Sequence, residues 1–192
     1  MRKLGLVLAF VAGAALILSA ISLANGRDDD KRGKGSVQAS LRGNGNAQAR
    51  LDGYQETPSI STEARGSFSA DVDDDRITFR LRYSGLEGGN ASVAHLHLGQ
   101  RHVMGGVSAF LCGGGGQPAC PAGASATITG TITAANVVGP TGQGIAAGEL
   151  DELIAAIRAG AVYANVHNAT YQNGEIRGQL RGGGRGNDND DD

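Results

Sequence analysis

Apolar and polar residues alternate along much of this chain, which is the pattern of a β-strand that buries one face. The clearest stretch is residues 77–83, where every second side chain is large and apolar, and residues 67–72 show the same period. Asp73, Asp74 and Asp75 separate the two stretches. Residues 64–83 therefore predict a β-hairpin with an acidic turn.

Further segments with strand character follow at short intervals, separated by residues that favour turns. They are residues 47–51, 92–98, 103–111, 126–133, 161–167 and 175–180. Many short strands joined by tight turns are typical of antiparallel sandwiches and barrels. The predicted fold is all-β, an antiparallel Greek-key-like β-sandwich or barrel.

One segment has a helical period instead. Leu150, Leu153, Ile154 and Ile157 fall on one face of a helix, and Gly160 suits the position just after a helix end. We expect one short helix over residues 149–159, packed across an end or a face of the sheets.

The two ends of the chain differ from the middle. Residues 1–24 have the form of a secretory signal peptide, with a basic start, an apolar stretch and small residues up to Ala24. The apolar stretch is short for a membrane span, so we expect cleavage before Asn25 and no span in the mature protein. Residues 25–46 and 182–192 offer almost nothing apolar to bury, and we expect a disordered leader and a disordered acidic tail. One folded domain remains, over residues 47–181.

Charge and composition narrow the class of partner. The formal net charge is −2, aromatic residues make up 4% of the chain, and Trp is absent. A mildly acidic chain with few aromatic rings is a poor match for nucleic acid. We expect a monomer, secreted or held in the periplasm or cell envelope, whose partner is an unidentified extracellular or cell-envelope component.

Cys112 and Cys120 are the two cysteines, and seven residues lie between them. In an exported protein an isolated pair at this spacing favours a disulfide. A two-thiolate metal site is the alternative, and it needs further ligands and a reducing compartment. We expect the disulfide.

Three of the four histidines lie in segments predicted as strands. His95 and His97 are two apart, so their rings project from one face of the strand. Two imidazoles at this spacing can bind copper or zinc, and such sites usually add a third ligand. His167 is the candidate third ligand, and Glu175 is a candidate further ligand or hydrogen-bond partner. His102 lies outside these segments and is expected to be solvated.

The alternative is that these residues are structural. A neutral imidazole donates through one nitrogen and accepts through the other, so it can join two strands. Arg177 can fork onto Glu175 or onto a group of carbonyls, and Asn165 is expected to be structural as well. Because the sequence does not place His167 beside the other two histidines, it favours the structural role, with metal binding as the alternative.

Sequence signals for catalysis are weak. The chain has no Gly-x-Ser-x-Gly motif, and the glycine run before Gln117 lacks the Lys and Ser/Thr of a phosphate-binding loop. Its carboxylates form no recognisable acid–base pair. We therefore expect a non-enzymatic protein, with a copper- or zinc-binding protein, either a redox or a hydrolytic enzyme, as the alternative.

Several segments together resemble the CHRD domain, the module repeated in chordin and found alone in many secreted microbial proteins. The resemblance covers about residues 47–181. It implies an extracellular single-domain module, and it assigns neither a reaction nor a ligand. The segments that carry it are Leu51–Pro58, Thr62–Gly66, Ala94–Gly99, Tyr163–His167 and Gly174–Leu180.

Overall fold

The structure, a computed structural model, describes residues 45–183. The predicted signal peptide, most of the predicted leader and most of the predicted tail lie outside these residues. The strands are β1 (Gly45–Asp52), β2 (Arg65–Val72), β3 (Ile77–Ser84), β4 (Ala91–Leu98), β5 (Gly106–Cys112), β6 (Ala126–Ile132), β7 (Val162–Asn168), β8 (Ile176–Gln179) and β9 (Arg181–Gly183). One α-helix, α1 (Leu150–Arg158), and three short 3₁₀ turns at Gly53–Gln55, Ala134–Asn136 and Thr141–Gln143 complete the described chain.

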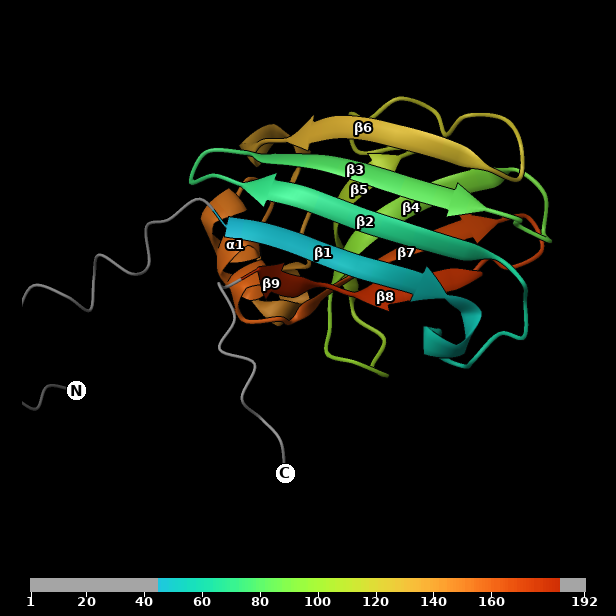
Figure 1. Cartoon of the computed structure of the whole chain (residues 1–192). Helices are drawn as coiled ribbons and strands as arrows, with labels where there is room; N and C mark the ends of the chain where they lie inside the picture. The colour runs from blue at the N-terminus through green and yellow to red at the C-terminus, as the bar shows by residue number, and fades with distance from the viewer. Residues whose placement is uncertain (1–44, 184–192) are drawn as a thin grey trace, which may run out of the picture. The chain divides into compact units, whose positions relative to one another are not determined.

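The strands form one antiparallel sheet that folds over on itself into a nearly closed barrel. Its order is β5-β4-β7-β8-β1-β2-β3-β6, and β9 pairs with the start of β1. In Figure 1, β1, β2, β3 and β6 make a front layer, and β4, β5 and β7 lie behind it. The predicted all-β sandwich or barrel with a single helix is confirmed.

The predicted hairpin forms in full, with β2 paired to β3 from Arg65↔Ser84 to Val72↔Ile77. Two boundaries differ from the prediction. β5 begins at Gly106 rather than at residue 103, because His102 has a positive φ of 62° and the chain turns there. The first and last strands in the sequence also reach into the predicted leader and tail, since β1 begins at Gly45 and β9 covers residues 181–183.

The helix lies where its apolar period predicts. Leu150, Leu153, Ile154 and Ile157 are buried, and Gly160 follows the helix end with a φ of 68°. The helix lies at the end of the front layer where β1 begins and β9 pairs with it (Figure 1). It covers that end of the hydrophobic core.

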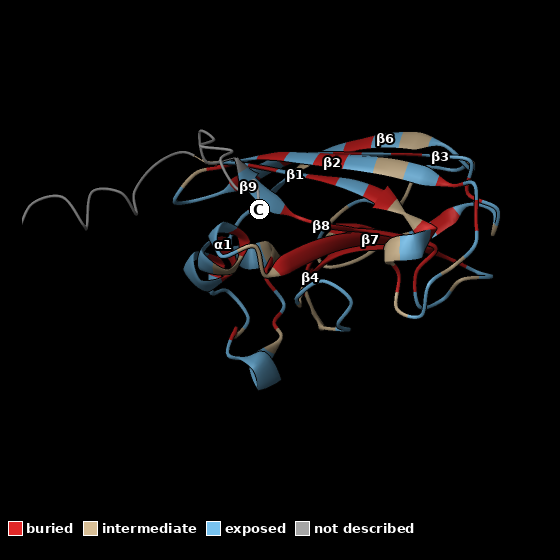
Figure 2. Ribbon diagram, turned by 60° about the horizontal axis from the view of Figure 1, so that its bottom comes forward, coloured by how far each residue is buried: buried red, intermediate tan, exposed pale blue. Residues whose placement is uncertain are grey.

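β7 differs from the front strands because both of its faces are buried. β3 alternates buried and exposed residues along its length, whereas all seven residues of β7 are buried. Figure 2 shows the same contrast, with β7 buried throughout and β2 and β3 striped. Val162, Ala164 and Val166 belong to the hydrophobic core between the layers. The alternate residues of β7 therefore belong to a second, polar layer on the outer side of the back strands.

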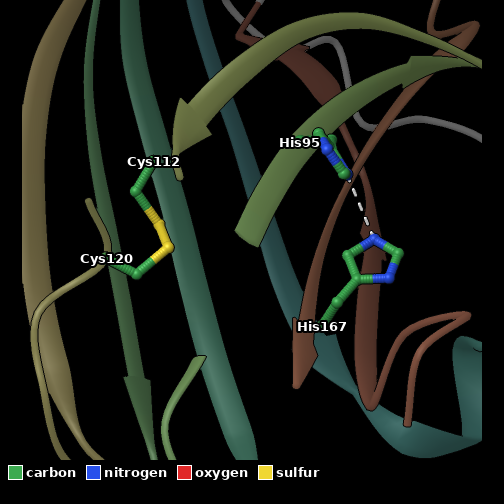
Figure 3. Close-up of a disulfide and its surroundings, with 4 residues drawn as sticks. All are labelled: His95, Cys112, Cys120 and His167. Carbon is green, nitrogen blue, oxygen red and sulfur yellow. Dashed lines mark hydrogen bonds between the residues drawn. A yellow bond between two sulfur atoms is a disulfide. The ribbon is translucent and has the colours of Figure 1, made fainter. Parts of the chain in front are cut away.

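The predicted disulfide between Cys112 and Cys120 is present and joins the end of β5 to the following loop (Figure 3). The glycines of this loop lie on Phe110: a Cβ at Gly114 or Gly115 would fall within 2.6 Å or 2.4 Å of its ring. Only glycine lets the backbone approach a ring this closely.

The disulfide closes a short ring beside the sheet, so its removal should act locally. We expect Cys112→Ala with Cys120→Ala to lower the free energy of unfolding by about 2–3 kcal/mol and to raise hydrogen exchange in residues 113–123. Exchange in β2 and β3 should stay slow. Loss of protection across all strands at once in the double variant would contradict this local role.

Candidate metal centre

The three histidines are brought together by the pairing of β4 with β7. His95 pairs with Asn165, His97 with Tyr163, and His167 with Val93. His95 and His97 alternate along β4 with the core residues Ala94 and Leu96. The histidine side chains and those of their partners on β7 therefore lie on the outer side of the strands. The strand period places His95 and His97 on one face as predicted, and the register adds His167 to that face.

The three imidazoles form a compact group. One ligand nitrogen from each lies within 4.8 Å of those of the other two, and each histidine is 8% exposed. His95 Nδ1 and His167 Nε2 are 3.2 Å apart, as the dashed line in Figure 3 marks. Nitrogens that share one ion at about 2.0–2.1 Å lie within about 4 Å of each other. The group is slightly wider than such a site, so the rings must move closer together to share one ion.

Main-chain carbonyls orient two of the three rings. His97 Nδ1 donates to the carbonyl of Gly105 at 2.9 Å, and His167 Nδ1 donates to that of Gln172 at 2.9 Å. A neutral imidazole whose Nδ1–H is used in this way carries its lone pair on Nε2. His97 Nε2 is buried and has no hydrogen-bond partner among the described residues. The structure thus holds an unused nitrogen lone pair beside two further imidazoles.

Burial keeps these rings neutral. Desolvation, followed by the neighbouring His167 and His97, lowers the pKa of His95 to about 3. Desolvation also lowers the pKa of His97 to about 4, although the carbonyl of Gly105 opposes the shift. The pKa of His167 is lowered by burial as well. Neutral imidazole is the form that binds metals.

Tyr163, Asn165 and Arg177 hold the histidines in place. The ring of His97 stacks on that of Tyr163, with an interplanar angle of 2° and centroids 4.7 Å apart. The Arg177 guanidinium lies 3.4 Å from the centre of the same Tyr163 ring. Asn165 Oδ1 lies 2.9 Å from His167 Nε2. These three residues position the site from β7 and β8.

Arg177 also fixes the loop that covers the site. It donates to the carbonyls of Gln100 and Val103 at 2.8 and 2.9 Å, and to the Thr57 hydroxyl at 3.3 Å. Of the two arrangements expected for Arg177, the carbonyl group is therefore the one found. Gly105, at the end of the same loop, accepts from His97 and donates to the Tyr163 hydroxyl.

Glu175 lies outside the histidine group. Its carboxylate accepts from the Thr62 hydroxyl at 2.8 Å, from the amides of Glu87 and Gly88 at 2.7 and 3.3 Å, and from the Asn168 side chain. A fully buried carboxylate with this many donors is satisfied where it lies. In this arrangement Glu175 joins two loops to the end of β7.

Sequence reasoning missed two neighbours of the site. Phe110 packs edge-to-face on His95 with ring centroids 4.5 Å apart, and its position opposite His95 follows only from the pairing of β4 with β5. Glu56 is buried in a loop, and its Oε1 has no hydrogen-bond partner among the described residues. Desolvation raises its pKa to about 7 against the opposing charge of Arg177. A single glutamate in a loop has no periodic pattern that could have revealed it. Tyr163, in contrast, could have been found, because it lies two residues before Asn165 on the same strand face.

The sequence profile of the CHRD domain matches residues 47–180. This chain therefore belongs to the CHRD family and is a single-domain module of it, which confirms the resemblance of its segments. CHRD domains are extracellular, and the disulfide is compatible with such a location. No curated protein and no solved structure matches the chain. Within residues 45–183, no helix has the length and apolar character needed to cross a membrane.

The lowered histidine pKa values predict a pH dependence with a defined sign. The folded state keeps His95 and His97 neutral, whereas the unfolded chain takes up protons below about pH 6.5. Their contribution to stability is thus lost as pH falls from about 6.5 toward 4. Glu56 acts in the opposite direction, because its raised pKa makes the folded state bind a proton first.

The histidine contribution is isolated by comparing the wild type with His95→Gln, His97→Gln. Between pH 7 and 4 we expect the wild type to lose about 6 kcal/mol more of its free energy of unfolding than the variant, about half of it from each ring. Urea unfolding of the metal-free proteins at each pH measures the difference. Parallel pH profiles for the two proteins would contradict neutral burial of the two rings.

Proposed function

We propose that this protein is a secreted, non-enzymatic CHRD module that binds one copper or zinc ion through His95, His97 and His167. The observation that carries the proposal is His97 Nε2, a buried nitrogen that has no hydrogen-bond partner among the described residues and belongs to a ring grouped with those of His95 and His167. The rings of His97 and His167 are held by carbonyl acceptors, which is the usual support of metal-binding histidines.

The alternative is a purely structural hydrogen bond between histidines that joins two strands, which we call a brace. A brace accounts for the histidine cluster less well than a metal site does. A brace needs only the contact between His95 and His167, which joins β4 to β7. It leaves His97 Nε2 buried and unsatisfied, at a cost of about 1–3 kcal/mol. An ion shared by the three rings uses that lone pair. The geometry therefore supports the ion better than the brace, although the sequence alone favours the brace.

The donor set favours copper or zinc among the common metals. Three neutral imidazoles suit these borderline ions, whereas calcium and magnesium prefer oxygen ligands. Both cysteines are in the disulfide and supply no thiolate. Tyr163 and Arg177 are engaged in stacking and hydrogen bonds that hold the site, and the Asn165 side chain lies beside His167. This arrangement supports binding of the ion more than turnover at it.

Metal content and stability test the proposal together. Protein made without an affinity tag, stripped with a chelator and then titrated with Cu²⁺ or Zn²⁺, should take up one ion per chain. At a free ion concentration of 100 times Kd, the free energy of unfolding should rise by about 2.7 kcal/mol. Elemental analysis and thermal unfolding give the two readouts.

The matched variants are His97→Ala and His102→Ala. His97→Ala should weaken metal binding at least 100-fold, because it removes one of the three nitrogen ligands. His102 is exposed and lies outside the cluster, so its variant should bind like the wild type. Equal binding by both variants, or no uptake and no thermal shift in the wild type, would refute the metal site and leave the brace.

Secretion has a separate test in the N-terminal sequence. We expect the exported protein to begin at Asn25, because the small residues that end at Ala24 form a signal-peptidase site. N-terminal sequencing of protein recovered outside the cytoplasm measures this. Recovery of the chain only in the cytoplasm, with residues 1–24 retained, would contradict secretion.

A further inference from the structure

The outer side of β1, β2, β3 and β6 is a continuous polar surface that the metal centre does not involve. The strand register sets the outward side chains in rows across the four strands. The apolar residues that alternate with them along each strand point into the core. One row is Gln48–Ser69–Arg80–Thr129, and the next is Arg50–Ser67–Arg82–Thr127. We call these two rows the arginine face.

The side chains of the arginine face are exposed and unengaged. Arg50, Arg80 and Arg82 are all exposed. The ion pairs of residues 45–183 are Arg76 with Asp73 and Asp75, and Arg158 with Asp74, and none of them lies on this face. Asp52 and Asp71 are the nearest carboxylates, in the rows on either side. A chain of net charge −2 thus presents a local positive surface with free guanidinium groups.

The spacing of the arginines suits an extended ligand. Arg80 and Arg82 are two residues apart on β3, about 7 Å, and Arg50 lies two strands from Arg82, about 10 Å. Small serines stand between Arg50 and Arg82 and beside Arg80. Three shallow hollows of about 530, 680 and 650 Å³ lie along this surface. Their lining includes Arg82, Arg80 and Arg50 respectively, and Asp71 and Asp52 also line the second and the third.

The chemistry of the face points to a class of ligand. Guanidinium groups bind carboxylate or sulfate groups through paired hydrogen bonds, and the rows of Ser, Thr and Gln can pair with hydroxyl groups. The outward residues include no aromatic ring, so neither bases nor the flat faces of neutral sugars have a stacking partner here. A positive surface with rows of hydroxyl groups matches an acidic sugar chain.

We propose that the arginine face binds an anionic polysaccharide that carries carboxylate or sulfate groups. The front layer that bears this face is separate from the back strands that carry the histidines (Figure 1). The module therefore has two independent sites on opposite layers. Binding to the polymer needs no metal, and metal binding needs no polymer.

The test compares two double variants of equal charge change. Arg80→Gln, Arg82→Gln removes two guanidinium groups from the face, and Arg76→Gln, Arg158→Gln removes two that lie off it. The full mature chain is titrated with polygalacturonate, dextran sulfate and neutral dextran at low and at physiological salt. The two charged polymers distinguish a carboxylate from a sulfate ligand. Thermal unfolding and metal uptake check that each variant is folded.

We expect the wild type and the Arg76/Arg158 control to bind at least one charged polymer in a salt-dependent manner and to ignore neutral dextran. The Arg80/Arg82 variant should bind at least 10-fold more weakly while taking up metal normally. No binding by the wild type, or equal loss in both variants, would overturn the proposal. Tighter binding to a single-stranded oligonucleotide would assign the face to nucleic acid instead. Binding that appears only after removal of residues 184–192 would assign it to the chain's own acidic end.

Discussion

Strand β7 is buried on both of its faces, and this burial determines how the loops around it must pack. One face of β7 completes the hydrophobic core, and the other bears Tyr163, Asn165 and His167, which cannot reach water. Buried polar groups are stable only when they have partners. The covering loops supply them: the carbonyls of Gly105 and Gln172 accept from histidines, Arg177 binds two more carbonyls of the loop that ends at Gly105, and Glu175 accepts from Thr62 and from the amides of Glu87 and Gly88. The nitrogen left over in this layer, His97 Nε2, is the centre of the functional account.

The polar layer also explains why a chain so rich in glycine is ordered in its loops. Loops with few apolar side chains gain little from burial, so side chains from the strands must anchor their backbones. Arg177 anchors the loop after β4 through two carbonyls, and Glu175 anchors the segment before β4 through two amides. The residues that position the histidines are therefore the same residues that close the fold around them. A change at Arg177 would disturb both the loop and the ring stack.

The alternation of apolar and polar residues predicts most of the fold. It is visible in the sequence wherever one strand face meets water, as in β2 and β3, and those elements were predicted nearly to the residue. The helix was predicted as well, because its apolar stripe has an unambiguous spacing. The start of β5 was misplaced, because Val103 and Met104 are apolar residues exposed in a turn. β9 was missed because its Arg-Gly-Gly sequence has no strand character and pairs only through its backbone.

At the site, the shared face of His95 and His97 follows from local spacing. The approach of His167 depends on the register of β4 with β7, and the approach of Phe110 on that of β4 with β5, and neither register is encoded locally.

Pulsed electron paramagnetic resonance of the copper-loaded protein shows whether three imidazoles share one ion. We expect couplings from the remote nitrogens of three imidazoles in the wild type and of two in His97→Ala, with His102→Ala identical to the wild type. A spectrum without imidazole couplings, or one that His97→Ala leaves unchanged, would contradict it.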